Sequence, residues 1–109
     1  MATYYSTYTF PNHKSGDTFL GTQFTLKDEH TTAINIAGAT IELITSSPSV
    51  KTLSTTTGEL TITNGAGGVF TIDEQIIDWE PGNYEYEIIF TFSSGRKRTY
   101  IVGFWEIVY

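Results

Sequence analysis

Alternation of apolar and polar residues is the dominant pattern of this sequence, and it predicts β-strands. The clearest case is the segment 84–92, where tyrosine, isoleucine or phenylalanine occupies every second position and Glu85, Glu87 and Thr91 lie between them. Successive side chains of a strand point to opposite faces, so this segment has one buried face and one largely solvated face. No stretch holds a helical period for even about twelve residues. The pattern therefore indicates an all-β protein.

Turn-forming residues separate the apolar segments at short intervals, as in a β-sandwich. Strands are expected over residues 4–10, 18–27, 39–45, 50–54, 59–63, 69–73, 84–92 and 97–108. In the second of these, Phe19 and Phe24 fall on opposite parities, and Gly21 between them suggests a bulge that restores the register. Parallel crossovers would need helices that the pattern lacks. We predict one domain over residues 1–109, an antiparallel β-sandwich of about seven to eight strands.

The final strand, 97–108, is apolar on both faces. One face carries Tyr100, Val102 and Phe104, and the other carries Ile101, Trp105 and Ile107. A sandwich strand needs only one apolar face, so something must cover the second. The cover is either the aromatic N-terminal arm or strand, residues 1–10, or a partner subunit. The surface that is not used internally should be the interface, and its candidate residues are Ile101, Trp105, Ile107, Tyr4, Tyr5 and Tyr8.

A structural corner is predicted just before the strand 84–92. In immunoglobulin-type sandwiches a tyrosine that follows a turn donates its hydroxyl back to the corner, while its ring caps the core. Tyr84 occupies that place, and Tyr86 should face the core where an antibody domain has its second cysteine. With these two tyrosines we assign Trp79, Pro81 and Gly82 to the corner, as structural rather than catalytic residues.

Composition narrows the partners of the protein. The 109-residue chain carries a formal net charge of −6 and no cysteine, so it has no disulfide or thiolate metal site, and it should be repelled by nucleic acids and anionic membranes. The N-terminus lacks the pattern of a signal peptide, and no run of about 18 apolar residues predicts a membrane span. The basic cluster Arg96-Lys97-Arg98 adjoins a predicted turn and is interpreted as a solvated hairpin tip, with a local anionic contact as the alternative.

No set of residues predicts catalysis. His13 and His30 have no partners at the spacing of a zinc site or a nucleophile. Four acidic residues gather on one connection but lack the pattern of a calcium loop: Asp73, Glu74, Asp78 and Glu80. An enzyme hypothesis would revive only if both histidines and these carboxylates converged in one cleft. We predict no enzyme activity, no metal and no cofactor.

Six segments in order carry a family resemblance: residues 16–18, 38–43, 60–72, 79–88, 94–96 and 103–108. On these segments the sequence resembles the immunoglobulin-like N-terminal domains of tailed-phage baseplate upper proteins and related phage virion modules. The resemblance implies a structural virion protein of a baseplate, tail, neck, head fibre or decoration, generally oligomeric and in contact with other virion proteins. Longer family members continue where this chain stops, at Tyr109.

A second function remains open from the sequence. In a carbohydrate or host-surface binding module, exposed tyrosines and Trp79 would stack on sugar rings, so a host glycan is the alternative partner.

Overall fold

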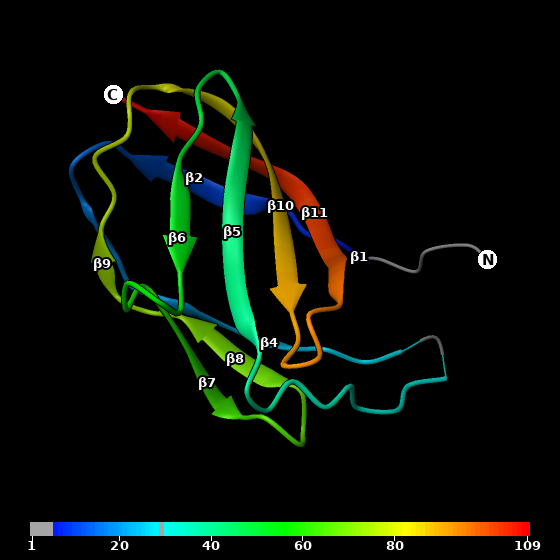
Figure 1. The fold of residues 1–109 in the computed structure, drawn as a ribbon. Coiled ribbons are helices and arrows are strands. Elements are labelled where there is room, and N and C mark those ends of the chain that lie inside the picture. The colour runs from blue at the N-terminus through cyan, green and yellow to red at the C-terminus, as the bar shows by residue number, and fades with distance from the viewer. Residues whose placement is uncertain (1–5, 29) are drawn as a thin grey trace.

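The protein is entirely β in its described part, which confirms the predicted fold class. A computed structural model describes residues 6–28 and 30–109 (Figure 1). Within these residues no helix is present that could span a membrane. The strands are β1 (Ser6–Thr7), β2 (Phe10–Lys14), β3 (Thr18–Phe19), β4 (Thr22–Thr25), β5 (Thr40–Ser47), β6 (Thr52–Ser54), β7 (Leu60–Asn64), β8 (Val69–Ile72), β9 (Gln75–Ile76), β10 (Gly82–Thr91) and β11 (Lys97–Val108).

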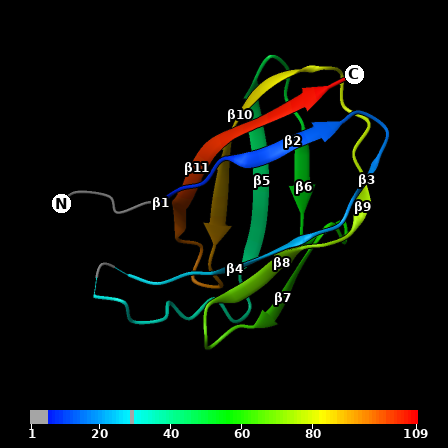
Figure 2. The same ribbon diagram turned by 180° about the vertical axis from the view of Figure 1, so that it is seen from behind.

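The larger sheet is built around the predicted C-terminal hairpin. Its strand order is β1-β11-β10-β5-β6, and β2 also pairs with β11. The strands β10 and β11 pair antiparallel, whereas β1 and β2 both run parallel to β11 along its free edge. In Figure 2 the blue N-terminal strands lie directly beside the red β11. The N-terminal arm is thus part of the sheet.

Two smaller sheets complete the fold, with the orders β4-β8-β7 and β3-β9. The hairpin between β7 and β8 turns through the glycine-rich residues 65–68, which lie between two of the predicted strands. Gly68 there has φ of 72°, and a Cβ atom at this position would lie 2.5 Å from the carbonyl oxygen of Leu26. Only glycine fits both the conformation and the contact, which confirms that this segment is a turn between strands.

Aromatic rings from the two main sheets meet in one core. Phe24 of β4 stacks on Phe70 of β8 with ring centroids 5.3 Å apart, and Phe70 meets Phe90 of β10 edge-on at 5.4 Å. The alternation predicted for β10 is confirmed, because Tyr84, Tyr86, Ile88 and Phe90 are buried while Glu85 and Glu87 are exposed.

Gly21 ends a strand instead of forming the predicted bulge. It lies between β3 and β4 with φ of 93°, and the chain passes there from one sheet to another. Phe19 pairs with β9 and Phe24 pairs with β8, so each ring takes its orientation from a different sheet. Both rings pack against the core. Because the two rings belong to strands of different sheets, no bulge is needed to bring both of them to the core.

Two strands were not expected from the sequence. The strand β2 begins at Phe10, where the predicted first strand ends, and Pro11 and the polar residues after it gave no strand pattern. The strand β9 lies within the acidic connection and has two residues. β2 pairs with β11, and β9 pairs with β3, so both partners are distant in the sequence. Local alternation therefore gives no signal for either strand.

Candidate functional site

The face of β11 that contains Ile101, Trp105 and Ile107 lies inside the protein. Trp105 is fully buried, Ile107 is 1 % exposed and Ile101 is 4 % exposed. The ring of Phe10 in β2 stacks on the Trp105 indole with centroids 4.2 Å apart and planes 19° apart. The choice of this face as the interface was therefore wrong, because the chain itself covers these three residues.

The described part of the N-terminal arm also packs against the rest of the protein. The Tyr8 amide donates to the carbonyl oxygen of Val102 at 2.9 Å, and the Tyr8 ring packs edge-on against Phe10 and Phe24 at 4.9 and 5.2 Å. Tyr8 is thus half-buried between the two sheets, which argues against its predicted role as a contact residue. The two other arm candidates, Tyr4 and Tyr5, lie outside the described residues.

Gly103 brings the arm against the hairpin, and the sequence interpretation missed it. Gly103 pairs with Tyr86 across the hairpin. A Cβ atom at Gly103 would lie 1.8 Å from the Tyr8 carbonyl oxygen and 3.0 Å from the Tyr86 hydroxyl. The Tyr86 hydroxyl donates a hydrogen bond to that same carbonyl. A glycine inside a strand is a signal of close backbone approach, and here it could have located the arm.

The predicted structural corner is present. The Tyr84 ring is fully buried, and its hydroxyl donates to the Glu80 carbonyl oxygen at 2.8 Å. Trp79 lies against this ring with centroids 5.2 Å apart. Pro81 is exposed in the turn, and Gly82 follows at a point where a Cβ atom would lie 2.9 Å from Cγ of Pro48. These contacts hold the start of β10 in place.

Burial also shapes the titration of the two core tyrosines. Desolvation raises the pKa of Tyr84 and, more strongly, the pKa of Tyr86. Glu80 beside the corner behaves oppositely, because a hydrogen bond from its own backbone and a second from Lys51 hold the pKa of its carboxyl below the usual value. The Lys51 ammonium lies 3.1 Å from this carboxylate. These groups stabilise a turn.

The acidic connection forms no metal centre in the part of the chain that the structure describes. No group of three or more potential ligands comes together there. Both oxygens of the Asp73 carboxylate accept hydrogen bonds, from Thr61 and Thr71, and Glu80 is held by Lys51 and Tyr84. Asp73 therefore stabilises the β7–β8 hairpin, and Glu80 stabilises the corner.

The sugar-binding alternative loses Trp79, one of the residues on which it relied. Trp79 is only 8 % exposed and also contacts Trp105, with centroids 5.3 Å apart. Its faces are occupied by the core, so it has no surface on which a sugar ring could stack.

The described residues leave the opposite face of the hairpin uncovered, and we call it the outer face. The register places Glu85 beside Phe104 and Glu87 beside Val102. Phe104 is 44 % exposed and is one of the exposed large hydrophobic residues of the described chain. The members of the outer face are Thr7, Glu42, Ile44, Glu85, Glu87, Ile89, Thr99, Val102, Phe104 and Glu106.

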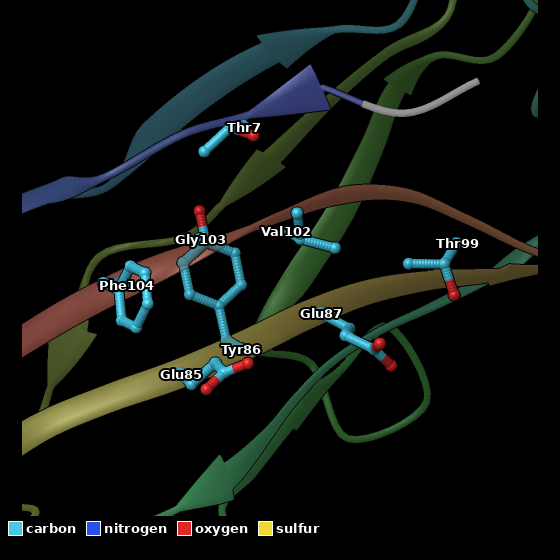
Figure 3. Close-up of a pocket in the computed structure, with 8 residues that line it drawn as sticks. All are labelled: Thr7, Glu85, Tyr86, Glu87, Thr99, Val102, Gly103 and Phe104. Carbon is cyan, nitrogen blue, oxygen red and sulfur yellow. The ribbon is translucent and has the colours of Figure 1, made fainter. Parts of the chain in front are cut away.

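A hollow of about 510 Å³ lies on the outer face where β1, β11 and β10 run side by side (Figure 3). In the close-up, Phe104 and Val102 flank Gly103 on one strand, and Glu85 and Glu87 flank Tyr86 on the next. Thr7 on β1 lies on one side of it. The lining residues are Thr7, Glu85, Tyr86, Glu87, Thr99, Val102, Gly103 and Phe104.

This hollow combines apolar and acidic groups. It presents an aromatic ring and an aliphatic side chain beside two carboxylates. Glu85 and Glu87 form no ion pair with any residue in the two described ranges. Exposed apolar surface with unpaired charge at its border is typical of a protein-binding site. A complementary partner would bring apolar surface and positive charge.

No protein-family model matches the sequence, and no curated protein matches it.

Proposed function

We propose that this protein is a non-enzymatic structural component of a tailed-phage virion, in the baseplate, tail, neck, head fibre or head decoration, and that it contacts other virion proteins through its outer face. The exposed Phe104 beside Glu85 and Val102 carries this proposal. These residues lie on the two longest strands, β10 and β11, so the surface is held rigidly before any partner arrives. A preformed apolar surface of this kind supports assembly.

The strand order supports an immunoglobulin-like sandwich as the finer fold. If β4, β5, β7, β8, β10 and β11 are the strands B, C, D, E, F and G, the order β4-β8-β7 corresponds to B-E-D and the order β5-β10-β11 to C-F-G. These are the two sheets of that architecture. The tyrosine corner at Tyr84 stands at the start of the corresponding strand F.

The experiment is to complement a phage that lacks this gene with tagged protein and to purify the particles. Wild-type protein should be recovered in the particles by mass spectrometry and located by gold-labelled antibody in electron micrographs. The variant Phe104→Asp should be soluble and folded but lost from the particles, because it places a charge in the apolar centre of the outer face.

The matched control is Leu20→Asp. Leu20 is 80 % exposed and lies outside the outer face, so this variant tests whether any exposed apolar residue matters. It should enter particles as the wild type does. Absence of the wild-type protein from purified particles would contradict the virion role, and normal entry of Phe104→Asp would contradict the assigned surface.

A further inference from the structure

We infer that the outer face receives the basic hairpin tip of a second copy of this chain, in a head-to-tail contact. The tip is defined as residues 93–98. It comprises the last four residues of the turn after β10 and the first two residues of β11. This inference rests on the proposed function only in taking the outer face as a protein-binding surface, and it names the partner.

The outer face carries four carboxylates, and Lys97 of the tip adjoins it at the start of β11, opposite Thr91. Glu85 and Glu87 project from β10. Glu106 of β11 pairs with Asn83, and Glu42 of β5 pairs with Ile89. None of these four carboxylates forms an ion pair with a residue from 6–28 or 30–109. Their charges are therefore left for a partner. A cationic group brought against this face would gain Coulomb energy that water and salt only partly screen.

The hairpin tip is the one basic cluster of the sequence, and it is well formed. Gly95 has φ of 90°, its amide donates to the Phe92 carbonyl oxygen at 2.8 Å, and the Phe92 amide donates to Arg96 at 2.8 Å. Arg96 and Lys97 are exposed, and neither forms an ion pair with the described residues. The turn thus presents two free cations on a fixed backbone.

A second hollow lies at this tip. Its volume is about 410 Å³, and Arg96, Arg98, Phe92 and Tyr100 contribute to its walls. The two arginines line this hollow together with Phe92 and Tyr100, whose ring centroids lie 6.4 Å apart. An arginine at such a tip can pair with a carboxylate and stack on an aromatic ring at the same time. The outer face offers both partners, in Glu85 and Phe104.

Within one chain the tip lies at the end of the hairpin, beyond the central carboxylates of the outer face. Lys97 pairs with Thr91, four residues beyond Glu87 on the same strand, which is a backbone separation of about 13 Å at about 3.3 Å per residue. Within the described residues no ion pair joins Lys97 to Glu85 or Glu87. A second copy can bring its tip directly against these carboxylates.

A symmetric dimer through two outer faces is the competing arrangement, and charge disfavours it. It would bring the carboxylates of both copies together, and like charges across an interface weaken binding. Joining face to tip instead uses two different surfaces. Such a heterologous contact repeats until it closes a ring or extends a filament.

The test measures self-association by sedimentation velocity and reverses each charge set separately. The face variant is Glu85→Arg with Glu87→Arg, and the tip variant is Arg96→Glu with Lys97→Glu. Wild-type protein should associate, and the association should weaken as salt is raised. Each variant alone should associate at least about tenfold more weakly. An equimolar mixture of the two should recover a complex, because the reversed tip then matches the reversed face.

Two controls each reverse one charge elsewhere, so they match the single variants Glu87→Arg and Lys97→Glu in the size of the charge change. Glu74→Arg and Lys14→Glu alter exposed residues outside both surfaces and should leave association unchanged. Circular dichroism of every variant tests whether it is folded. If a double variant does not fold, the single change Glu87→Arg or Lys97→Glu takes its place.

Three results would overturn the inference: a wild-type monomer at every concentration, association that neither reversal weakens, or a mixture that recovers no complex. Any of these would leave the proposed function standing if Phe104→Asp still fails to enter particles, because another virion protein would then be the partner. Loss of the proposed function would instead appear as wild-type protein that is absent from particles.

Discussion

The two faces of the β10–β11 hairpin use the same strands and alternate residues, yet they differ in almost every property. The inner face carries Tyr86 and Trp105, which are buried to 1 % exposure or less, and the outer face carries Glu87 and Phe104, which are open to solvent. The described part of the N-terminal arm lies along the edge of β11, and on the inner side its Phe10 stacks on Trp105. Stability and assembly are therefore separable on this hairpin.

This separation means that neighbouring residues should respond to substitution in opposite ways. A change on the inner face should cost stability whatever the partner, whereas a change on the outer face should cost assembly and leave folding nearly intact. The predictions that follow test this contrast.

The largest effect is expected from the pair Trp105→Ala and Phe104→Ala. Truncating the buried indole should lower the free energy of unfolding by about 3–5 kcal/mol, because it removes core contacts and leaves a cavity. The same change at the half-exposed Phe104 should cost about 1 kcal/mol or less. Denaturant unfolding followed by far-ultraviolet circular dichroism measures both values. Equal losses would contradict the division between the faces.

A second prediction concerns the contact between the arm and the hairpin. Gly103→Ala places a methyl group against the Tyr8 carbonyl and should lower the free energy of unfolding by about 1–3 kcal/mol as the arm is displaced. Hydrogen exchange of the Tyr8 and Phe10 amides should accelerate. The control is Ala37→Gly at an exposed loop position, which should leave exchange in the arm unchanged. Unaltered arm protection in Gly103→Ala would show that the arm is not held there.

The core tyrosines predict a loss of stability in alkali. Because burial raises the pKa of Tyr84 and Tyr86 in the folded protein above the ordinary value of 10.0, the unfolded chain loses these protons first as pH rises. The stability that they contribute is complete below pH 10 and declines above it, by up to about 1.4 kcal/mol per pH unit for each tyrosine.

Tyr86→Phe isolates one of these contributions. It should lower stability at neutral pH by about 1–2 kcal/mol, since the Tyr8 carbonyl loses its donor, and it should reduce the decline above pH 10. Urea unfolding at pH 7, 10 and 11 gives both quantities. A decline as steep as that of the wild type would exclude Tyr86 as its source.

The smallest effect on the inner face is expected from Trp105→Phe. The Trp105 indole nitrogen is buried and has no hydrogen-bond partner among residues 6–28 and 30–109, so phenylalanine removes no hydrogen bond that the structure shows and keeps a ring against Phe10. The cost should be about 1–2 kcal/mol, well below that of Trp105→Ala. Unfolding in denaturant measures the difference. A loss as large as that of the alanine variant would mean that the indole nitrogen has an unrecognised partner.

The sequence carried much of this structure in its local patterns. The alternation over β10 predicted which side chains are buried, and the turn before Tyr84 predicted the corner, because both depend on residues that are close together in the chain. The glycine-rich turn before β8 was predicted for the same reason.

The choice between the two apolar faces of β11 could not be made from alternation alone. Parity separates Trp105 from Phe104 but does not say which of them meets the core. That depends on the parallel pairing of β2, whose partner is about ninety residues away in the chain, a non-local contact that leaves no local pattern. Two residues held the missing signal: Gly103 on the Trp105 side marks a close approach, and Glu106 on the Phe104 side marks solvent.

The assignment of the outer face is tested most directly by hydroxyl-radical footprinting of the protein, free and assembled in purified particles. In the free protein Phe104 should be oxidised readily, while the buried Trp105 should be protected despite its greater intrinsic reactivity. In the particles Phe104 should become protected, and Trp105 should stay protected as the internal control. Equal oxidation of Phe104 in the free and assembled protein would contradict the central claim that the outer face of the hairpin is where this protein meets its partners.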